Sequence, residues 1–243
     1  MIKILGIILL AGSVLAISWF LLYNTYNNDR NAETGPVNME TIKESEITLP
    51  SPQETSQVSI EEALLKRRSV RQYKDEPLNL EEISQLLWAA QGINDSKVAG
   101  RTSPSAGATY PLEVYLTIRK ADKIKPGVYR YLPENHKLIK VSEGDVSGQL
   151  AETALNQMFI GQAPVSLVFS AVFERTTGRY GQRGVRYVYM EAGHASQNVY
   201  LQAQSLRLVT VVVGAFDEEE VKEILNLPQE EIPLYIMPVG KPL

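Results

Sequence analysis

The loop over residues 101–113 has a composition suited to binding a small molecule. It reads Arg-Thr-Ser-Pro-Ser-Ala-Gly-Ala-Thr-Tyr-Pro-Leu-Glu and leads directly into the alternating apolar segment 112–118. Small residues of this kind leave backbone N–H groups and hydroxyls exposed, with no bulky side chain to exclude a flat ligand. Loops rich in Ser, Gly and Pro also precede many ordinary strands, so this loop alone does not specify a site.

A second polar cluster lies upstream at residues 67–71, which read Arg-Arg-Ser-Val-Arg. Guanidinium groups match the geometry of a phosphate, and the Ser69 hydroxyl adds a neutral donor. The cluster follows a predicted helix, where basic residues can also serve only to complement the helix dipole. The spacing alone leaves a phosphate site and a helix-end role equally open.

Helices and strands that would position these residues can be predicted from capping patterns and periodicity. Ser59–Glu62 opens a helix that ends near Arg67, and Asn79–Glu82 opens a second that stops at Gly92. Further helices are predicted over 146–158, 184–206 and 217–226, and strands over 114–118, 127–131, 138–141, 165–172, 208–213 and 234–239. Because these elements interleave without a βαβ repeat or a Gly-x-Gly-x-x-Gly turn, an α+β sheet flanked by helices is favoured over a Rossmann fold.

Composition excludes several kinds of chemistry. The 243 residues include 24 Lys or Arg and 28 Asp or Glu, and the net charge of −4 disfavours a nucleic-acid partner. No Cys is present, so disulfides, thiolate metal sites and a Cys nucleophile are excluded. The two histidines, His136 and His194, lie far apart in the chain, and no metal site is expected. Two-electron chemistry would therefore need an organic cofactor.

The N-terminal region is predicted to form a membrane anchor followed by a tether. Residues 4–23 contain no charge and are long enough to cross a bilayer, although a cleaved signal peptide is the alternative. Lys3 precedes this run, which favours an extracytoplasmic domain behind a single-pass anchor over residues 1–23. Residues 24–58 are polar and predicted to be a flexible linker, which leaves 59–243 as the folded domain.

Several motifs, taken in order, resemble the nitroreductase family of flavin enzymes, and more narrowly its SagB-type branch of azoline dehydrogenases. Besides the two clusters above, these are Leu-Leu-Trp-Ala-Ala-Gln-Gly at 86–92, Gly-Val-Tyr-Arg-Tyr at 127–131, Glu-Ala-Gly-His-Ala-Ser-Gln-Asn at 191–198 and Val-Gly-Ala-Phe at 213–216. The resemblance runs from about residue 59 to residue 243. It implies a nitroreductase-like, mainly antiparallel central sheet with FMN as cofactor.

The resemblance also implies which residues contact FMN. Arg67, Arg68 and Ser69 match the family's phosphate and ribityl motif, and Arg71 would approach N1 and O2 of the ring. A cation at that edge favours reduction of the flavin. The remaining implied contacts are the ring loop Pro104, Ser105, Ala106 and Gly107, the backbone of Gly214 and Ala215 at N5, and Lys241 near the phosphate.

At residues 179–180 the family's azoline dehydrogenases carry a proton-handling Lys-Tyr pair, and this chain has Arg179 and Tyr180. Tyr180 can act as an acid or base, but a guanidinium does not deprotonate in proteins. The pair is the expected catalytic site, with a solvated charged loop as the alternative. The Arg in place of Lys puts azoline oxidation itself in doubt.

Three functions follow from the resemblance. The first is a SagB-type dehydrogenase that transfers hydride from a small-molecule or peptide-heterocycle substrate to flavin N5. The alternatives are an NAD(P)H-dependent nitro or quinone reductase and a non-catalytic, membrane-tethered flavin-binding protein. Family members are homodimers with flavins at the subunit interface, so two FMN per dimer are expected. The apolar character of 184–206 is typical of a core or interface helix.

Overall fold

The computed structural model describes residues 46–95, 97 and 100–243. The predicted anchor and residues 24–45 of the predicted linker lie outside this part of the chain, so the anchor stays a prediction. Among the residues described, no helix is long and apolar enough to cross a membrane. The described residues from Glu46 onward form one compact unit.

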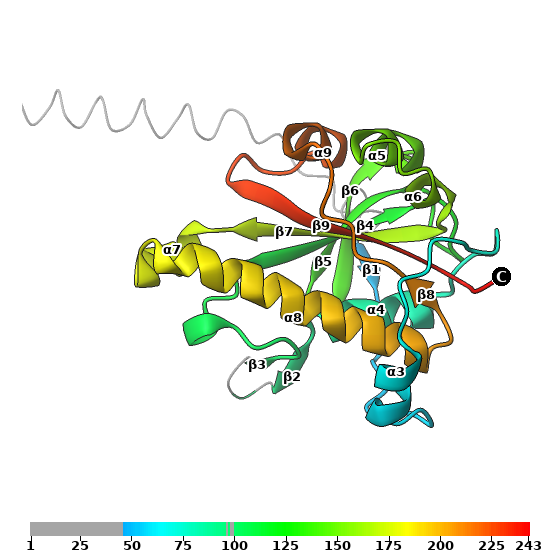
Figure 1. Ribbon diagram of the computed structural model, residues 1–243, viewed down its shortest axis with the longest axis horizontal. Coiled ribbons are helices and arrows are strands. Elements are labelled where there is room, and N and C mark those ends of the chain that lie inside the picture. The colour runs from blue at the N-terminus through cyan, green and yellow to red at the C-terminus, as the bar shows by residue number, and fades with distance from the viewer. Residues whose placement is uncertain (1–45, 96, 98–99) are drawn as a thin grey trace, which may run out of the picture. The chain divides into compact units, whose positions relative to one another are not determined.

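A seven-stranded sheet forms the centre of this unit (Figure 1). Its strand order is β1-β6-β5-β4-β7-β9-β8, and every neighbouring pair is antiparallel, which confirms the predicted α+β class. The strands are β1 (Glu46–Thr48), β4 (Leu112–Ile118), β5 (Gly127–Leu132), β6 (Lys137–Glu143), β7 (Val165–Val172), β8 (Val209–Thr210) and β9 (Glu231–Gly240). A separate short ribbon pairs β2 (Ile93–Asp95) with β3 (Gly100–Arg101).

Helices cover both faces of the sheet (Figure 1). On one face lie α4 (Leu80–Gln91) and the long α8 (Arg183–Ser205), with α3 (Ile60–Lys66) packed on α8. On the other lie α5 (Ser147–Thr153), α6 (Phe159–Gln162) and α9 (Glu218–Leu225). All seven residues of β4 are buried because both faces of this strand are covered. The central strand β4 therefore lies between the two helical layers, paired with β5 and β7.

The predicted helix starts are confirmed. Asn79 and Glu82 form a complete capping box at α4, and the Ser59 side chain accepts the Glu62 N–H at α3. Asp217 caps α9 in the same manner. Caps depend on a few adjacent residues, which is why they can be read from the sequence.

The folded unit begins earlier than predicted, because residues 46–58 belong to it. β1 pairs with β6, and Leu49 is buried in the main core. The Ser84 hydroxyl donates to the Pro50 carbonyl at 2.6 Å, and the Gln53 N–H donates to Gln85 Oε1 at 2.8 Å. The polar composition of this segment gives no indication of β1, because its partner β6 lies about ninety residues later in the chain.

Three other regions differ from what the sequence led us to expect. The single helix expected over 146–158 is interrupted between α5 and α6, because Leu155 and Asn156 adopt positive φ angles of 57° and 59°. Residues Glu174–Tyr180 form a helix, α7. A solvated charged loop had been the alternative to a catalytic role for Arg179 and Tyr180. The strand expected over 208–213 shortens to β8 plus a single bridge from Val213 to Ile236.

Candidate functional site

The arginine-rich segment at residues 67–71 runs along the edge of the sheet. The Val70 N–H donates to the Thr210 carbonyl at 3.0 Å, and Ser69 forms a parallel bridge with Thr210. Farther along, the Lys74 N–H donates to the Lys241 carbonyl at 3.0 Å. These bonds fix the segment in extended form beside β8 and the end of β9, so its side chains reach the surface next to the C-terminal residues.

The three guanidinium groups of this segment have no carboxylate partner among the described residues. Arg67 lies over the Tyr200 ring, 5.2 Å from its centroid, and Arg71 lies 5.6 Å from that of Phe159. Arg68 donates only to the carbonyls of residues 65 and 67. Arg68 and Arg71 are exposed, and Arg67 is half-buried. Guanidinium groups without a carboxylate partner are the donor set that a phosphate monoester requires.

Ser69 is held in place by α8. Its Oγ lies 3.0 Å from the Tyr200 hydroxyl, and that hydroxyl accepts the Val212 N–H at 2.8 Å. Tyr200 therefore links the arginine segment to the chain that leads into Gly214. The sequence did not single out Tyr200, because a Tyr on an apolar helix is read most simply as a core residue.

Gly214 and Ala215 follow the Val213–Ile236 bridge and lie at the surface. Within the described part of the chain their N–H groups donate no hydrogen bond, while the Ala215 carbonyl accepts from Gln157 Nε2 at 3.2 Å. Two free N–H donors beside the arginine segment fit the polar edge of a planar heterocycle. The predicted FMN contacts from 67–71 and 214–215 are thus brought together.

Lys241 lies at the edge of this group and already has a partner. Its Nζ lies 3.6 Å from Glu76 Oε2. Gly240 packs so closely on Tyr73 that an added Cβ would lie 2.8 Å from the Tyr73 Cβ. The C-terminus is therefore held against the arginine segment, but the Lys241 charge is partly satisfied by Glu76.

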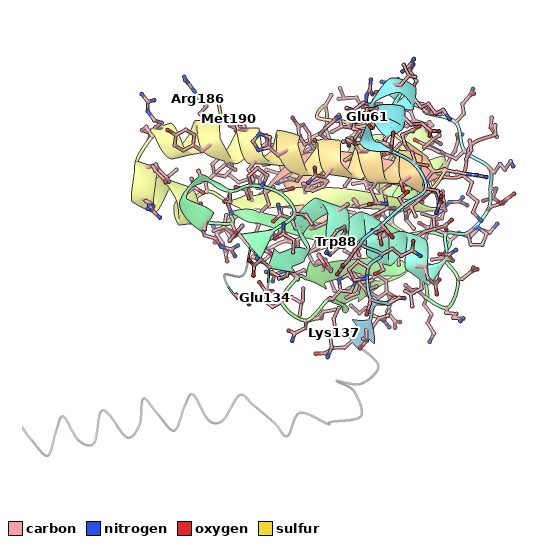
Figure 2. All side chains as sticks on the ribbon, turned by 90° about the horizontal axis from the view of Figure 1, so that it is seen from below. Glu61, Trp88, Glu134, Lys137, Arg186 and Met190 are labelled. Atoms are coloured by element: carbon pink, nitrogen blue, oxygen red, sulfur yellow. The ribbon has the colours of Figure 1, made fainter. Side chains whose placement is uncertain are left out.

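The predicted ring loop lies elsewhere along α8. Residues Ala106–Ala108 form a short 3-10 turn in which Gly107 has a φ of 61°. Pro104, Ser105 and Ala106 face Tyr187, Met190 and His194 of α8 across a cavity of about 280 Å³. Figure 2 shows Met190 and Arg186 projecting from the outer surface of this end of α8.

Within one chain, this loop and the arginine segment lie apart. The loop borders α8 at Glu191, whereas Ser69 contacts α8 at Tyr200. Nine residues separate these two positions, which at 1.5 Å per residue is about 13 Å along the helix axis. The ring loop and the arginine segment are therefore two partial sites, located at different positions along α8.

Arg179 and Tyr180 contact the ring loop directly. Arg179 Nη1 donates to the Gly107 carbonyl at 3.0 Å. A Cβ at Gly107 would lie 2.5 Å from the Tyr180 hydroxyl, so only Gly permits this approach. The Tyr180 ring also meets the Tyr187 ring edge-on at 5.2 Å. The predicted catalytic pair and the loop form a single group of residues.

α7 is fixed against this loop by an ion pair that the sequence did not reveal. Arg175 Nη2 lies 2.7 Å from Glu113 Oε1, and its Nη1 donates to the Tyr110 carbonyl at 3.1 Å. Glu113 also pairs with Arg130 of β5 at 3.0 Å. Glu113 is the last residue of the loop motif, but its partner is on a helix sixty residues later.

A buried acid, Glu191, also went unrecognised. Glu191 is only 2% exposed and lies beside the ring loop, where both line the same cavity. Burial raises the pKa of its carboxyl to about 7, against the opposing effects of the Ser105 hydroxyl, the Arg101 charge and the Gln91 amide. The available signal was its spacing, because Glu191 falls in the same helical stripe as the buried Val188, Ala195 and Val199.

Comparison with known proteins identifies the family of this chain. The model of the Nitroreductase family matches residues 64–241. A protein of Methanocaldococcus jannaschii whose name describes it as a nitroreductase is 50% identical over 81% of this chain and 96% of its own length. The FMN reductase [NAD(P)H] of Bacillus subtilis is 27% identical over 74% of this chain and 64% of its own.

A second kind of relative is the microcin B17-processing protein McbC of Escherichia coli, 29% identical over 67% of this chain and 62% of its own length. Among solved structures, a nitroreductase-type protein of Ralstonia eutropha superposes with a TM-score of 0.73 at 30% identity, covering 86% of this chain and 92% of its own. The family match spans most of the chain and includes both partial sites. The chain belongs to the nitroreductase family, a family of oxidoreductases.

Proposed function

We propose that this protein is an FMN-dependent oxidoreductase of the SagB-type dehydrogenase class. The observation that carries the proposal is the set of unpaired guanidinium groups of Arg67, Arg68 and Arg71 beside the free N–H groups of Gly214 and Ala215. FMN would supply two-electron chemistry at this position. Arg67, Arg68 and Ser69 would hold its phosphate end, and Arg71 would place positive charge at the ring edge.

Arg179 and Tyr180 are the proposed catalytic residues. Tyr180 would remove or hold the substrate proton, and Arg179 would stay charged and anchor the loop through Gly107. The similarity to McbC, a microcin-processing protein, favours a peptide heterocycle or a comparable small molecule as the substrate. The contact between Tyr180 and the ring loop supports this role, because the proton would leave next to the cofactor.

The functional unit is proposed to be a homodimer with two FMN molecules. The separation of about 13 Å along α8 means that the ring loop and arginine segment of one chain contact different parts of this helix. A second copy could bring its loop to the first chain's arginine segment. Exposed apolar side chains on α3 and α8, including Leu65 at 73% and Met190 at 51%, support burial of these helices by a partner.

A second candidate is an NAD(P)H-dependent nitro or quinone reductase. It is supported by the similarity to the Bacillus subtilis FMN reductase and by Arg179, which cannot serve as the base that a Lys would provide. The two functions differ in the electron donor that reduces the flavin.

Anaerobic absorbance spectroscopy of the purified protein tests the proposal. Loss of the flavin absorbance on adding NADPH would favour the reductase. A flavin that resists NADPH but is reduced by a heterocyclic substrate would support the dehydrogenase. Bound flavin that no donor reduces would indicate a binding protein without turnover.

A further inference from the structure

Two buried side-chain atoms in the described part of the chain have no hydrogen-bond partner, and they belong to neighbouring residues. They are Gln91 Nε2 on α4 and Glu191 Oε1 on α8. The Gln91 amide is close enough to lower the pKa of the Glu191 carboxyl, but the two residues form no hydrogen bond of ordinary geometry. Gln91 is fully buried, and Glu191 is 2% exposed. Leaving such a group unsatisfied costs about 1–3 kcal/mol, and native proteins seldom retain one without a function.

The nearby positive charge, that of Arg101, is bonded to other groups than Glu191. Arg101 Nη1 donates to Gln91 Oε1 at 3.1 Å, and its Nη2 pairs with Glu134 at 3.0 Å. The same guanidinium lies over the Tyr110 ring, 4.6 Å from the centroid. No Lys, Arg or His nitrogen in the described residues forms an ion pair with Glu191, so its negative form lacks a direct counterion.

Ser105 connects this acid to the ring loop. The Ser105 Oγ accepts the Tyr110 N–H at 2.9 Å, which leaves one lone pair and the hydroxyl proton for other partners. Its hydroxyl is the neighbour that most favours the charged form of Glu191. An ionised Glu191 therefore attracts the Ser105 proton, whereas a neutral Glu191 can donate to Ser105 and release that proton toward a ligand at the loop.

We propose that Glu191 is a proton-accepting positioning residue, which takes up a proton when the bound flavin is reduced and thereby turns the Ser105 hydroxyl toward the flavin. This inference rests on the proposed FMN-dependent function. In turnover, a hydride from the reductant would bring two electrons and one proton to give the anionic reduced flavin, and one further proton would pass from solvent to Glu191. In a redox titration with an electron donor, both protons come from solvent. Glu191 itself forms and breaks only an O–H bond.

The environment makes this uptake possible near neutral pH. Burial raises the pKa of Glu191 to about 7, and negative charge added at the loop would raise it further. Above pH 7 the acid would be ionised before reduction and neutral after it. The other titratable groups on this side come from three elements. Arg101 is already paired, and Tyr110 lies beneath its guanidinium. Arg179 and Tyr180 of α7 contact the loop at Gly107, and Tyr187 and His194 of α8 line the cavity.

The test is the pH dependence of the flavin midpoint potential in the full-length wild type and in Glu191→Gln, which is permanently neutral and nearly the same size. Below about pH 7 the midpoint potentials of the two proteins should change with pH at the same slope. Above it the wild-type slope should be steeper by about 30 mV per pH unit, because a tenfold change in proton activity shifts a two-electron couple by 29.6 mV per proton. Ser105→Ala should lose most of this extra slope, whereas Glu152→Gln, an exposed acid on α5, should retain it.

Wild type and Glu191→Gln with parallel potentials over the whole range would overturn the inference and leave the proposed function intact. Absence of bound flavin in the wild type would overturn both. If Glu191→Gln does not fold, reduced-minus-oxidised infrared spectra of the wild type at about pH 8 decide the matter. The inference expects a new carbonyl band from a protonated carboxyl group, and its absence would contradict it.

Discussion

Replacing Gly107 by Ala should separate catalysis from cofactor binding. The φ of 61° at Gly107 costs an L-residue about 1–2 kcal/mol. The added Cβ would lie 2.5 Å from the Tyr180 hydroxyl and 2.8 Å from Arg179 Nη1. Carbon contacts relax to about 3.5 Å, so these two side-chain ends must move by about 1 Å.

Both displaced atoms are the far ends of flexible side chains, so the fold should survive. A misplacement of about 1 Å at a reacting group can lower turnover by about 100-fold. We therefore expect Gly107→Ala to keep its FMN and most of its stability, while kcat falls between 10-fold and 100-fold, as an order-of-magnitude estimate. The assays are FMN stoichiometry, thermal unfolding and steady-state turnover.

Gly144→Ala is the matched control. Gly144 also has a positive φ, 96°, but an added Cβ there meets no atom within 4 Å. The control should show backbone strain without loss of turnover. Equal kcat values in the two variants would refute the reasoning, because the contact between the loop and Tyr180 would then be irrelevant to the reaction.

Three further predictions concern charge, pH and assembly. Arg71→Ala should weaken FMN binding or lower the flavin potential, since it removes an unpaired cation; unchanged affinity and potential, by fluorescence and redox titration, would contradict its role. Urea unfolding should show wild type losing about 3 kcal/mol relative to Glu191→Gln between about pH 4.5 and pH 7, because its pKa rises from 4.5 to about 7 on folding and each unit is worth about 1.36 kcal/mol. Here the native state holds a proton that the unfolded state releases, so stability falls as pH rises; parallel curves would count against a raised pKa. Met190→Asp should yield monomers without FMN in size-exclusion chromatography, and a monomeric wild type that retains flavin would disprove the dimer.

Features set by adjacent residues were predictable from the sequence. The capping box at Asn79, the cap at Asp217 and the long helix that became α8 were all expected with nearly correct bounds. The arginine segment and Gly214 were expected to bind one ligand, and the structure brings them together through Thr210 and Tyr200. Short-range capping and strong periodicity carry this information because no distant partner is needed.

Features that depend on distant partners were not predictable. β1 forms only because β6 offers an edge, and its sequence resembles a polar tether. The ion pair between Glu113 and Arg175 joins residues from a strand and a helix whose contact is created by the fold. The separation of the ring loop from the arginine segment along α8 likewise follows from packing, although both motifs were recognised.

The absorbance spectrum of the purified protein, with the released cofactor quantified, tests the central claim most directly. One FMN per chain, with the stoichiometry reduced when Arg67 and Arg71 are both replaced by Ala, is the predicted result. A protein that is colourless when purified and remains so after incubation with FMN would contradict the account, because the exposed guanidinium groups and free N–H donors would then hold no flavin.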